Sequence, residues 1–266
     1  MNNNAKKNID TKTLKSNLNN LPNKFQIYIF KYPKKKKCPN QIVAYITIEN
    51  NKIKSKLSFM KASKRSKAQN ADKIKKWLDK YHTILIVLES PHIYEYNNSY
   101  GIIAPAMGKT GKYLQSNFEA LLCPHIENGR YRVILMNSIP YQCSLGVNPK
   151  YYRDAMWLKI WYDCGGRQDF ESKLQKTQNA EYIFNLCTKG EHYEDIKNEA
   201  NKKTQKIKES YIEGLKLSTS IEPPKNNYSI QSHVQDVIDT ICGNAKRFTG
   251  PHPSSWWRAL PIISKV

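Results

Sequence analysis

The chain begins with a polar stretch and then alternates between continuous apolar runs and stretches whose apolar residues recur at helical spacing. The continuous runs are typical of strands buried on both faces of a sheet. They occupy residues 83–89, 131–137, 180–187 and, in shorter form, 246–250. The amphipathic stretches predict helices, since their apolar residues fall on one face. They occupy residues 108–122, about 151–162 and 229–243.

This alternation of strands and helices predicts an α/β fold with right-handed crossovers. We expect a three-layer α/β/α sandwich with a central, mostly parallel four-stranded sheet, formed by residues 71–266. A charged stretch near 192–225 predicts a helical insertion in this domain. Residues 1–70 predict a basic N-terminal extension, in which the β-branched and aromatic runs 24–33 and 41–49 favour a β-hairpin.

The charge of the chain indicates a polyanionic partner. Its 266 residues include 43 Lys and Arg against 22 Asp and Glu, a formal net charge of +21. Such an excess commonly serves DNA binding, because lysines that neutralise phosphates release condensed counterions. An AT-rich genome, whose codons favour Lys and Asn, is an alternative source of part of this lysine content. We expect a DNA partner, duplex or single-stranded.

The sequence indicates neither a membrane location nor a metal. It has no apolar run long enough to span a bilayer and no secretory signal, so we expect a cytoplasmic monomer without a membrane partner. Its six cysteines are scattered singly without a CxxC pair, and we expect buried, reduced thiols, no metal site and no cofactor.

Three predicted strands end in unusual polar residues. Glu89 and His92 follow the run 83–89, Asn137 and Ser138 end the run 131–137, and His252 follows the last short strand. Ligands of open α/β sheets bind just beyond the carboxyl ends of the strands. If these strands are neighbours, a carboxylate, an amide and an imidazole meet in one pocket. An amide offers a donor and an acceptor together, which suits the edge of a pyrimidine.

These strand ends resemble the motifs of the uracil-DNA glycosylase superfamily. Its first motif reads GQDPYH or, in another branch, GEAPG, and this chain has LESPH. Its second motif ends in LLLN, and this chain has VILMN; its last motif is HPSPLS or HPS-like, and this chain has HPSSWW. A third strand that ends before a Gly, in YIFNLCTKG, also fits. The resemblance covers about residues 75–258 without the insertion.

The resemblance implies an enzyme that flips a base out of DNA and hydrolyses its N-glycosidic bond without a metal or redox cofactor. Asn137 would read the flipped base, and His252 would donate to the departing base. Glu89 would supply the catalytic carboxylate, since it matches the Glu of GEAPG. The resemblance also implies residues that contact DNA. They are Pro91, Ser254, Ser255 and a wedge, Trp256, that fills the vacated stack.

The chain departs from the family at two positions of the first motif. Ser90 stands where GQDPYH has Asp, and His92 stands where it has Tyr, so His92 is expected to line the pyrimidine C5 side of the base site. Ser138, beside Asn137, is expected to line the same site. Lys109 lies in GKTGK, an incomplete P-loop pattern, and we expect a helix N-terminus that touches a DNA phosphate.

The sequence leaves several alternatives open. The substrate is uracil or a related pyrimidine; the alternatives are a defence glycosylase that removes a hypermodified base from viral DNA and a catalytically silent DNA-binding protein on the same fold. Each residue also has a purely structural interpretation. Asn137 and His252 can cap backbone groups, Glu89 can form a salt bridge, and Trp256 can pack the C-terminal segment.

Overall fold

The structure is a computed structural model, and it describes the chain in ten segments. These are residues 37–54, 57–61, 64, 80–92, 95–96, 102–143, 150–177, 179–189, 229–258 and 261–266. The predicted strand at 24–33 and the charged insertion near 192–225 lie outside the described residues. The predictions made for them stay predictions.

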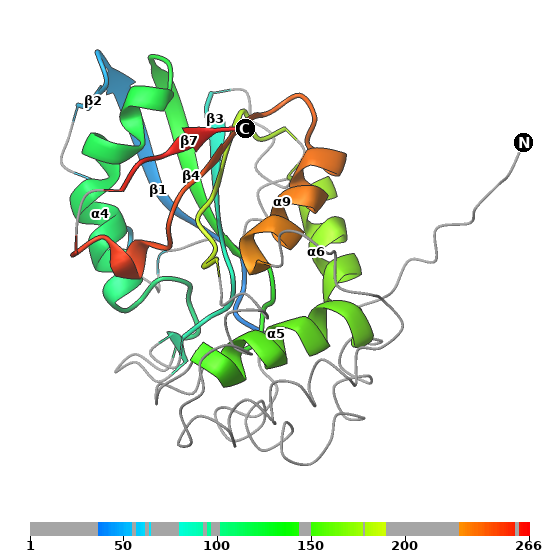
Figure 1. The fold of residues 1–266 in the computed structure, drawn as a ribbon. Coiled ribbons are helices and arrows are strands. Elements are labelled where there is room, and N and C mark those ends of the chain that lie inside the picture. The colour runs from blue at the N-terminus through cyan, green and yellow to red at the C-terminus, as the bar shows by residue number, and fades with distance from the viewer. Residues whose placement is uncertain are drawn as a thin grey trace, which may run out of the picture.

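The described chain folds around one curled, seven-stranded mixed sheet with the order β2-β1-β4-β3-β5-β6-β7 (Figure 1). The strands are β1 Gln41–Glu49, β2 Lys52–Ile53, β3 His82–Leu88, β4 Gly129–Asn137, β5 Tyr182–Asn185, β6 Lys246–Thr249 and β7 Ser264–Lys265. The central strands β4, β3, β5 and β6 are parallel, and the three outer strands are antiparallel to their neighbours.

The prediction of a four-stranded sheet is therefore wrong in size. Strand β1 pairs with β4 along most of its length, and its side chains are buried at most positions, so it extends the main sheet. Asn50 and Asn51, with φ of 51° and 61°, turn the chain from β1 into β2. Two residues with positive φ form the tight turn that suits a twisted hairpin. Residues 41–53 thus share the sheet of the predicted α/β domain.

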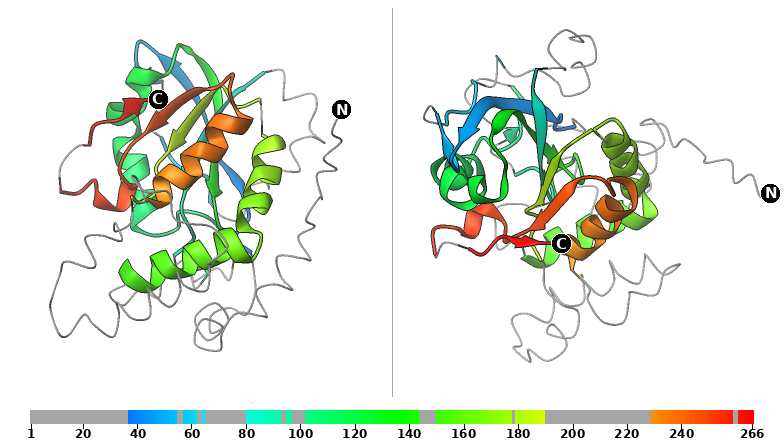
Figure 2. Two further views of the ribbon diagram at one scale, coloured as in Figure 1. Left: turned by 45° about the vertical axis from the view of Figure 1, so that its right-hand side comes forward. Right: turned by 90° about the horizontal axis from the view of Figure 1, so that it is seen from above.

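Helices cover both faces of the sheet (Figure 2). Helix α4 (Lys109–Leu121) packs on one face, where its buried residues join Leu88, Leu135 and Phe184 in one apolar cluster. Helices α5 (Lys150–Asp163), α6 (Gly166–Gln175) and α9 (Ile230–Ile241) supply the second cluster, on the other face. Among the described helices, none is both long and apolar enough to cross a membrane.

The loop that leads into α4 is held close against the first turn of the helix. Ala106 has a φ of 54°, and its amide donates to Oε1 of the buried Glu95 at 2.8 Å. The carbonyl oxygen of Ala106 lies 1.8 Å from the place where a Cβ on Gly111 would be. Only glycine at 111 therefore allows this loop to approach the helix.

We predict that Gly111→Ala destabilises the protein by about 1–3 kcal/mol, because the added methyl group displaces backbone rather than a flexible side chain. Chemical denaturation of both proteins measures the difference. Gly243→Ala is the control, since a Cβ at Gly243 meets nothing within 4 Å. Equal stabilities of the two variants would contradict the close approach.

Candidate active site

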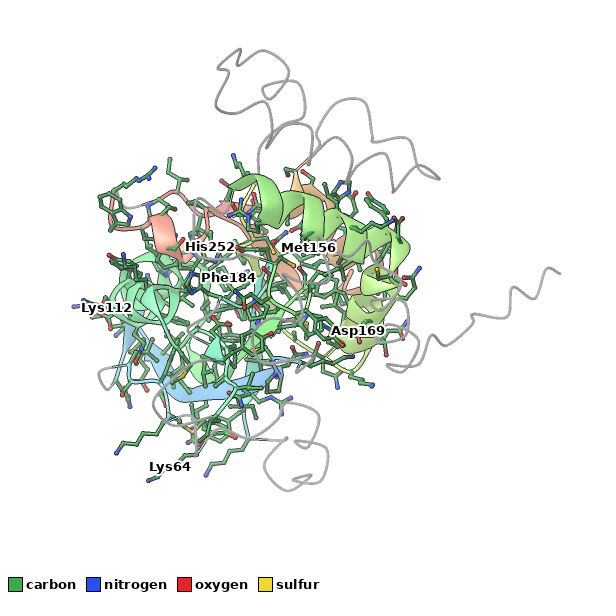
Figure 3. All side chains as sticks on the ribbon, turned by 90° about the horizontal axis from the view of Figure 1, so that it is seen from below. Lys64, Lys112, Met156, Asp169, Phe184 and His252 are labelled. Atoms are coloured by element: carbon green, nitrogen blue, oxygen red, sulfur yellow. The ribbon has the colours of Figure 1, made fainter. Side chains whose placement is uncertain are left out.

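The carboxyl ends of the central strands bring Glu89, Asn137 and His252 to one end of the sheet. Figure 3 labels His252 in a view of the molecule from below. Strands β3 and β4 are neighbours, and Leu88 lies opposite Asn137 in their register. Glu89 follows β3 directly, and β6 leads through Gly250 into the loop of His252. Strand β5 lies between β3 and β6, so His252 must reach across the end of β5 to meet Glu89.

His252 makes this contact. Its Nε2 lies 3.3 Å from Oε2 of Glu89, and both side chains are largely buried. The same carboxylate oxygen accepts a hydrogen bond from the amide of Thr188, at 3.4 Å, in the loop that leaves β5. Segments that follow three different strands therefore meet at one carboxylate.

The surroundings of His252 favour its neutral imidazole. Burial lowers its pKa below the ordinary 6.5, the nearby Glu89 opposes this, and Arg153 on α5 adds to the lowering. The amide of Ser254 donates to Nδ1 at 3.2 Å, so Nδ1 is the unprotonated nitrogen. The remaining proton is on Nε2, which donates to Glu89. The contact is thus a hydrogen bond from a neutral imidazole rather than an ion pair.

Both serines of the HPSS loop bond to His252 itself. The hydroxyl of Ser254 lies 2.7 Å from Nδ1, and the hydroxyl of Ser255 donates to the carbonyl of His252 at 2.8 Å. A 3-10 turn, η6 (Pro253–Ser255), carries these contacts. The serines therefore hold the imidazole in place; the predicted contact of their hydroxyls with DNA stays a prediction.

The carbonyl of Glu89 is fixed by three donors. The amide of Ile139, the hydroxyl of Ser138 and the indole nitrogen of Trp157 lie 3.0, 2.7 and 3.2 Å from it. The indole nitrogen is also 3.1 Å from the Ser138 hydroxyl. Ser138 is fully buried and acts as a brace between the ends of β3 and β4. The structure thus gives this hydroxyl partners within the protein, while its predicted role in base binding stays a prediction.

Asn137 is the unusual member of the site. Only 2% of it is exposed, yet neither Oδ1 nor Nδ2 has a hydrogen-bond partner among the described residues. By alternation along β4 it lies on the face of Val133 and Leu135, the face that α4 covers. The cap role that the sequence left open requires such a partner. A buried, unpaired amide costs about 1–3 kcal/mol, so it needs an explanation such as a ligand.

A buried ion pair supports the backbone behind Asn137. Lys173 on α6 donates to the carbonyls of Asn137 and Ser138, at 3.2 and 3.4 Å. Its Nζ is also 3.0 Å from Asp169, which in turn lies 3.2 Å from Lys37. Burial alone would raise the pKa of Asp169, but the two lysines outweigh it and hold that pKa below its ordinary value. Burial lowers the pKa of Lys173, and the charge of Asp169 opposes this. The contacts of Lys173 with Asp169 and with the two carbonyls tie α6 to the end of β4.

Three further predicted residues remain. Pro91 and His92 follow β3 and are at least partly covered, whereas Lys109 on α4 is exposed. Pro91 is buried and His92 is half-buried. Burial lowers the pKa of His92, and the charges of Glu89 and His252 act on it, so His92 belongs to the same electrostatic cluster. Lys109 is exposed at the first residue of α4, which packs against η6.

The structure does not favour Trp256 as a wedge. It is 3% exposed, belongs to the apolar cluster beneath α4, and donates its indole N–H to the carbonyl of Pro251 at 2.9 Å. A wedge has to be free to enter the base stack. Trp257 is 62% exposed, with the guanidinium of Arg258 lying 5.2 Å from its ring centre. The packing role foreseen for Trp256 is the one that the structure shows, and Trp257 is the exposed ring of this loop.

Sequence reasoning missed several residues that build the site. Thr188 and Arg153 carry no motif, and their roles depend on loops and helices that meet only in the fold. Trp157 lies in the helix expected at about 151–162, and that expectation does not reveal the contact of its indole nitrogen with Glu89. Lys173 lies in α6, a helix that was not predicted, and a lysine is usually exposed. A lysine and an aspartate four residues apart in a helix were the one available signal.

The described residues contain no cluster of three His, Cys, Asp or Glu side chains that could hold a metal ion. All six cysteines are buried and none of them forms a disulfide, as expected. The side chains available for chemistry at this site are the carboxylate of Glu89, the imidazole of His252 and the amide of Asn137.

We predict that Lys173→Met destabilises the protein by about 3–5 kcal/mol, because it leaves Asp169 buried with one partner fewer. Chemical denaturation measures the change. Arg167→Met is the matched control on the same helix: Arg167 forms an exposed pair with Glu171, and its loss is expected to cost about 0.5 kcal/mol. A difference of less than about 1 kcal/mol between the variants would contradict a stabilising ion pair.

Comparisons of the chain with protein-family models, with characterised proteins and with solved structures find no match.

Proposed function

We propose that this protein is a DNA glycosylase, related to the uracil-DNA glycosylase superfamily, that hydrolyses the N-glycosidic bond of a flipped pyrimidine. One observation carries the proposal: Glu89, His252 and the unpaired Asn137 occupy one edge of the sheet, at the strand ends where the resemblance expects them. Fold alone would not support an activity, since function depends on the site.

The three side chains suit the hydrolysis. Water forms a bond to the sugar C1′, the bond from C1′ to the base breaks, and the base leaves with the electron pair of that bond. The proton that the water loses ends on the departing base, so the products are the C1′ hydroxyl and the neutral base. The carboxylate of Glu89 stabilises the cationic sugar and orients the water. The Nε2–H of His252, which donates to Glu89 in the free protein, turns to the carbonyl oxygen of the base as negative charge develops there. Asn137 holds the far edge of the base.

The free protein keeps this site closed. Both amide atoms of Asn137 are inaccessible to solvent. The proposed reaction therefore requires that the segments covering Asn137 move apart when the base enters. Closure around the flipped base would then exclude bulk water, which strengthens each electrostatic contact in the site.

The exposed residues beside His252 suit a DNA backbone. Lys109 and Lys112 are exposed on α4, which packs against η6, and Trp257 and Arg258 follow η6 directly. Lysines provide the salt-dependent attraction to phosphates. Trp257 is the exposed aromatic ring able to stack where the base has left, which is worth about 1–3 kcal/mol. Both the repair of uracil and the removal of a hypermodified viral base are compatible with this surface.

A second candidate is a DNA-binding protein of the same fold without catalysis. Ser90, which stands at the aspartate position of the GQDPYH motif, favours it. The two candidates differ in a single measurement, the release of a base from bound DNA.

We predict that the protein releases a pyrimidine base and leaves abasic sites in DNA. Duplex oligonucleotides with uracil and phage DNA with modified cytosine are the substrates, and alkaline cleavage at abasic sites is the measurement. Because they remove groups that act in the transition state, Asn137→Ala and His252→Ala should each lower the rate at least about 100-fold while DNA binding survives. His82→Ala, an exposed histidine at the amino end of β3, is the control.

Salt-sensitive DNA binding without base release from any substrate would reject the enzyme and favour the silent protein. Full activity of His252→Ala would instead reject this site as the place of the chemistry.

We predict an acidic limit of activity that lies below the ordinary histidine pKa. The neutral form of His252 persists as pH falls through 6.5, because its pKa is lowered. The single-turnover rate of base release should therefore be constant across 6.5 and decline only at lower pH. His92 also has a lowered pKa, so His92→Gln is the control that removes its titration. The decline should persist in this variant, because it is assigned to His252. A decline that begins above 6.5 in both proteins would contradict a lowered pKa of His252 as the cause of the acidic limit.

A further inference from the structure

Two buried asparagines end β4 and β5, the strands on either side of β3, and they differ in how their side-chain amides are held. Asn185, the last residue of β5, is fully buried; its Nδ2 donates to the carbonyl of Gln231 and to Oε1 of Gln235, both at 3.0 Å. Its Oδ1 accepts from the amide of Cys187 at 3.3 Å. These contacts determine which end of the amide is the donor end.

Asn137, the last residue of β4, has no such contacts within the described part of the chain. Lys173 holds its backbone carbonyl, so the main chain at Asn137 is fixed while the amide is not. The outer torsion of an asparagine has two broad minima related by a half-turn. Both orientations of the amide are therefore open to Asn137, and exchanging them breaks no hydrogen bond to the described residues.

The orientation of the amide decides which base it can pair with, because the N3 edge of a pyrimidine carries one of two opposite donor and acceptor patterns. A 4-oxo pyrimidine such as uracil offers a donor at N3 and an acceptor at O4. A 4-amino pyrimidine such as cytosine offers an acceptor at N3 and a donor at N4. One orientation of an amide pairs with the first edge, and a half-turn pairs it with the second. An amide fixed like that of Asn185 would match only one of them, because the other would place like groups together.

We infer that Asn137 accepts 4-oxo and 4-amino pyrimidines alike, and that the site does not select between uracil-type and cytosine-type bases at this edge. This rests on the proposed function and names its substrate class: pyrimidines with either hydrogen-bonding pattern. Selection among them then depends on the substituents of the ring and on the ease with which each base leaves.

Binding rather than turnover tests this inference, because the two bases differ as leaving groups. The probes are duplexes with one 2′-fluoroarabinouridine or one 2′-fluoroarabinocytidine, whose glycosidic bonds resist hydrolysis. Each stands opposite a tetrahydrofuran abasic analogue, so that base pairing does not oppose flipping. A duplex with the abasic analogue on both strands is the reference, and fluorescence anisotropy gives each Kd.

We expect the full-length protein to bind both probes more tightly than the reference, with Kd values within about tenfold of each other, a ratio of the size expected for one misplaced hydrogen bond. Asn137→Leu, of similar shape, should weaken both probes by similar factors. This variant loses an unpaired buried amide, so it should fold at least as stably as the unchanged protein.

A ratio of the two Kd values above about tenfold would overturn the inference, since the amide would then be held in one orientation. An Asn137→Leu variant that weakens only one probe, or neither, would also overturn it. If neither probe binds more tightly than the reference, the proposed function fails, and that outcome is distinct from a strong preference for one base.

Discussion

The position just after β3 is the point on which the rest of the site depends. The carbonyl of Glu89 accepts from Ile139, Ser138 and Trp157, and its carboxylate accepts from Thr188 and His252. These donors come from segments that follow β4, β5 and β6 and from helix α5. Contacts to Glu89 therefore tie together the segments that follow the central parallel strands. The shape of a pocket at this end of the sheet depends on those contacts.

Much of the fold follows from local pattern. The runs 83–89 and 131–137 became β3 and β4 within two residues, because strands buried on both faces leave an unbroken apolar signal. The number of strands in the sheet could not be predicted from local sequence pattern in the same way. Strand β1 has the composition of a strand, but its pairing with β4 is a long-range contact that no local pattern records. Strand β7 is too short to leave a pattern, and α6 has few apolar residues.

The residues at the strand ends were predictable, whereas their partners were not. Polar residues directly after buried strands stand out, and the contact of His252 with Glu89 agrees with the expectation that these ends converge. Which of two adjacent tryptophans is buried depends on the direction of the η6 turn, so the sequence did not separate Trp256 from Trp257. Lys173 was hidden for a similar reason, because its burial depends on how α6 lies beneath β4.

Most of the polar side chains discussed at the carboxyl end of the sheet have hydrogen-bond partners within the protein. The amide of Asn137 has none among the described residues. Asn185 is paired at both ends, Ser138 is a brace, and Lys173 has its carboxylate partner. Folding could have paired Asn137 in the same way, and leaving its amide unpaired reduces stability by about 1–3 kcal/mol. A ligand that pairs with this amide recovers that loss on binding, so the same free energy that weakens the folded protein would strengthen the binding of the proposed base. The defect in the core and the proposed recognition are thus one feature of the molecule.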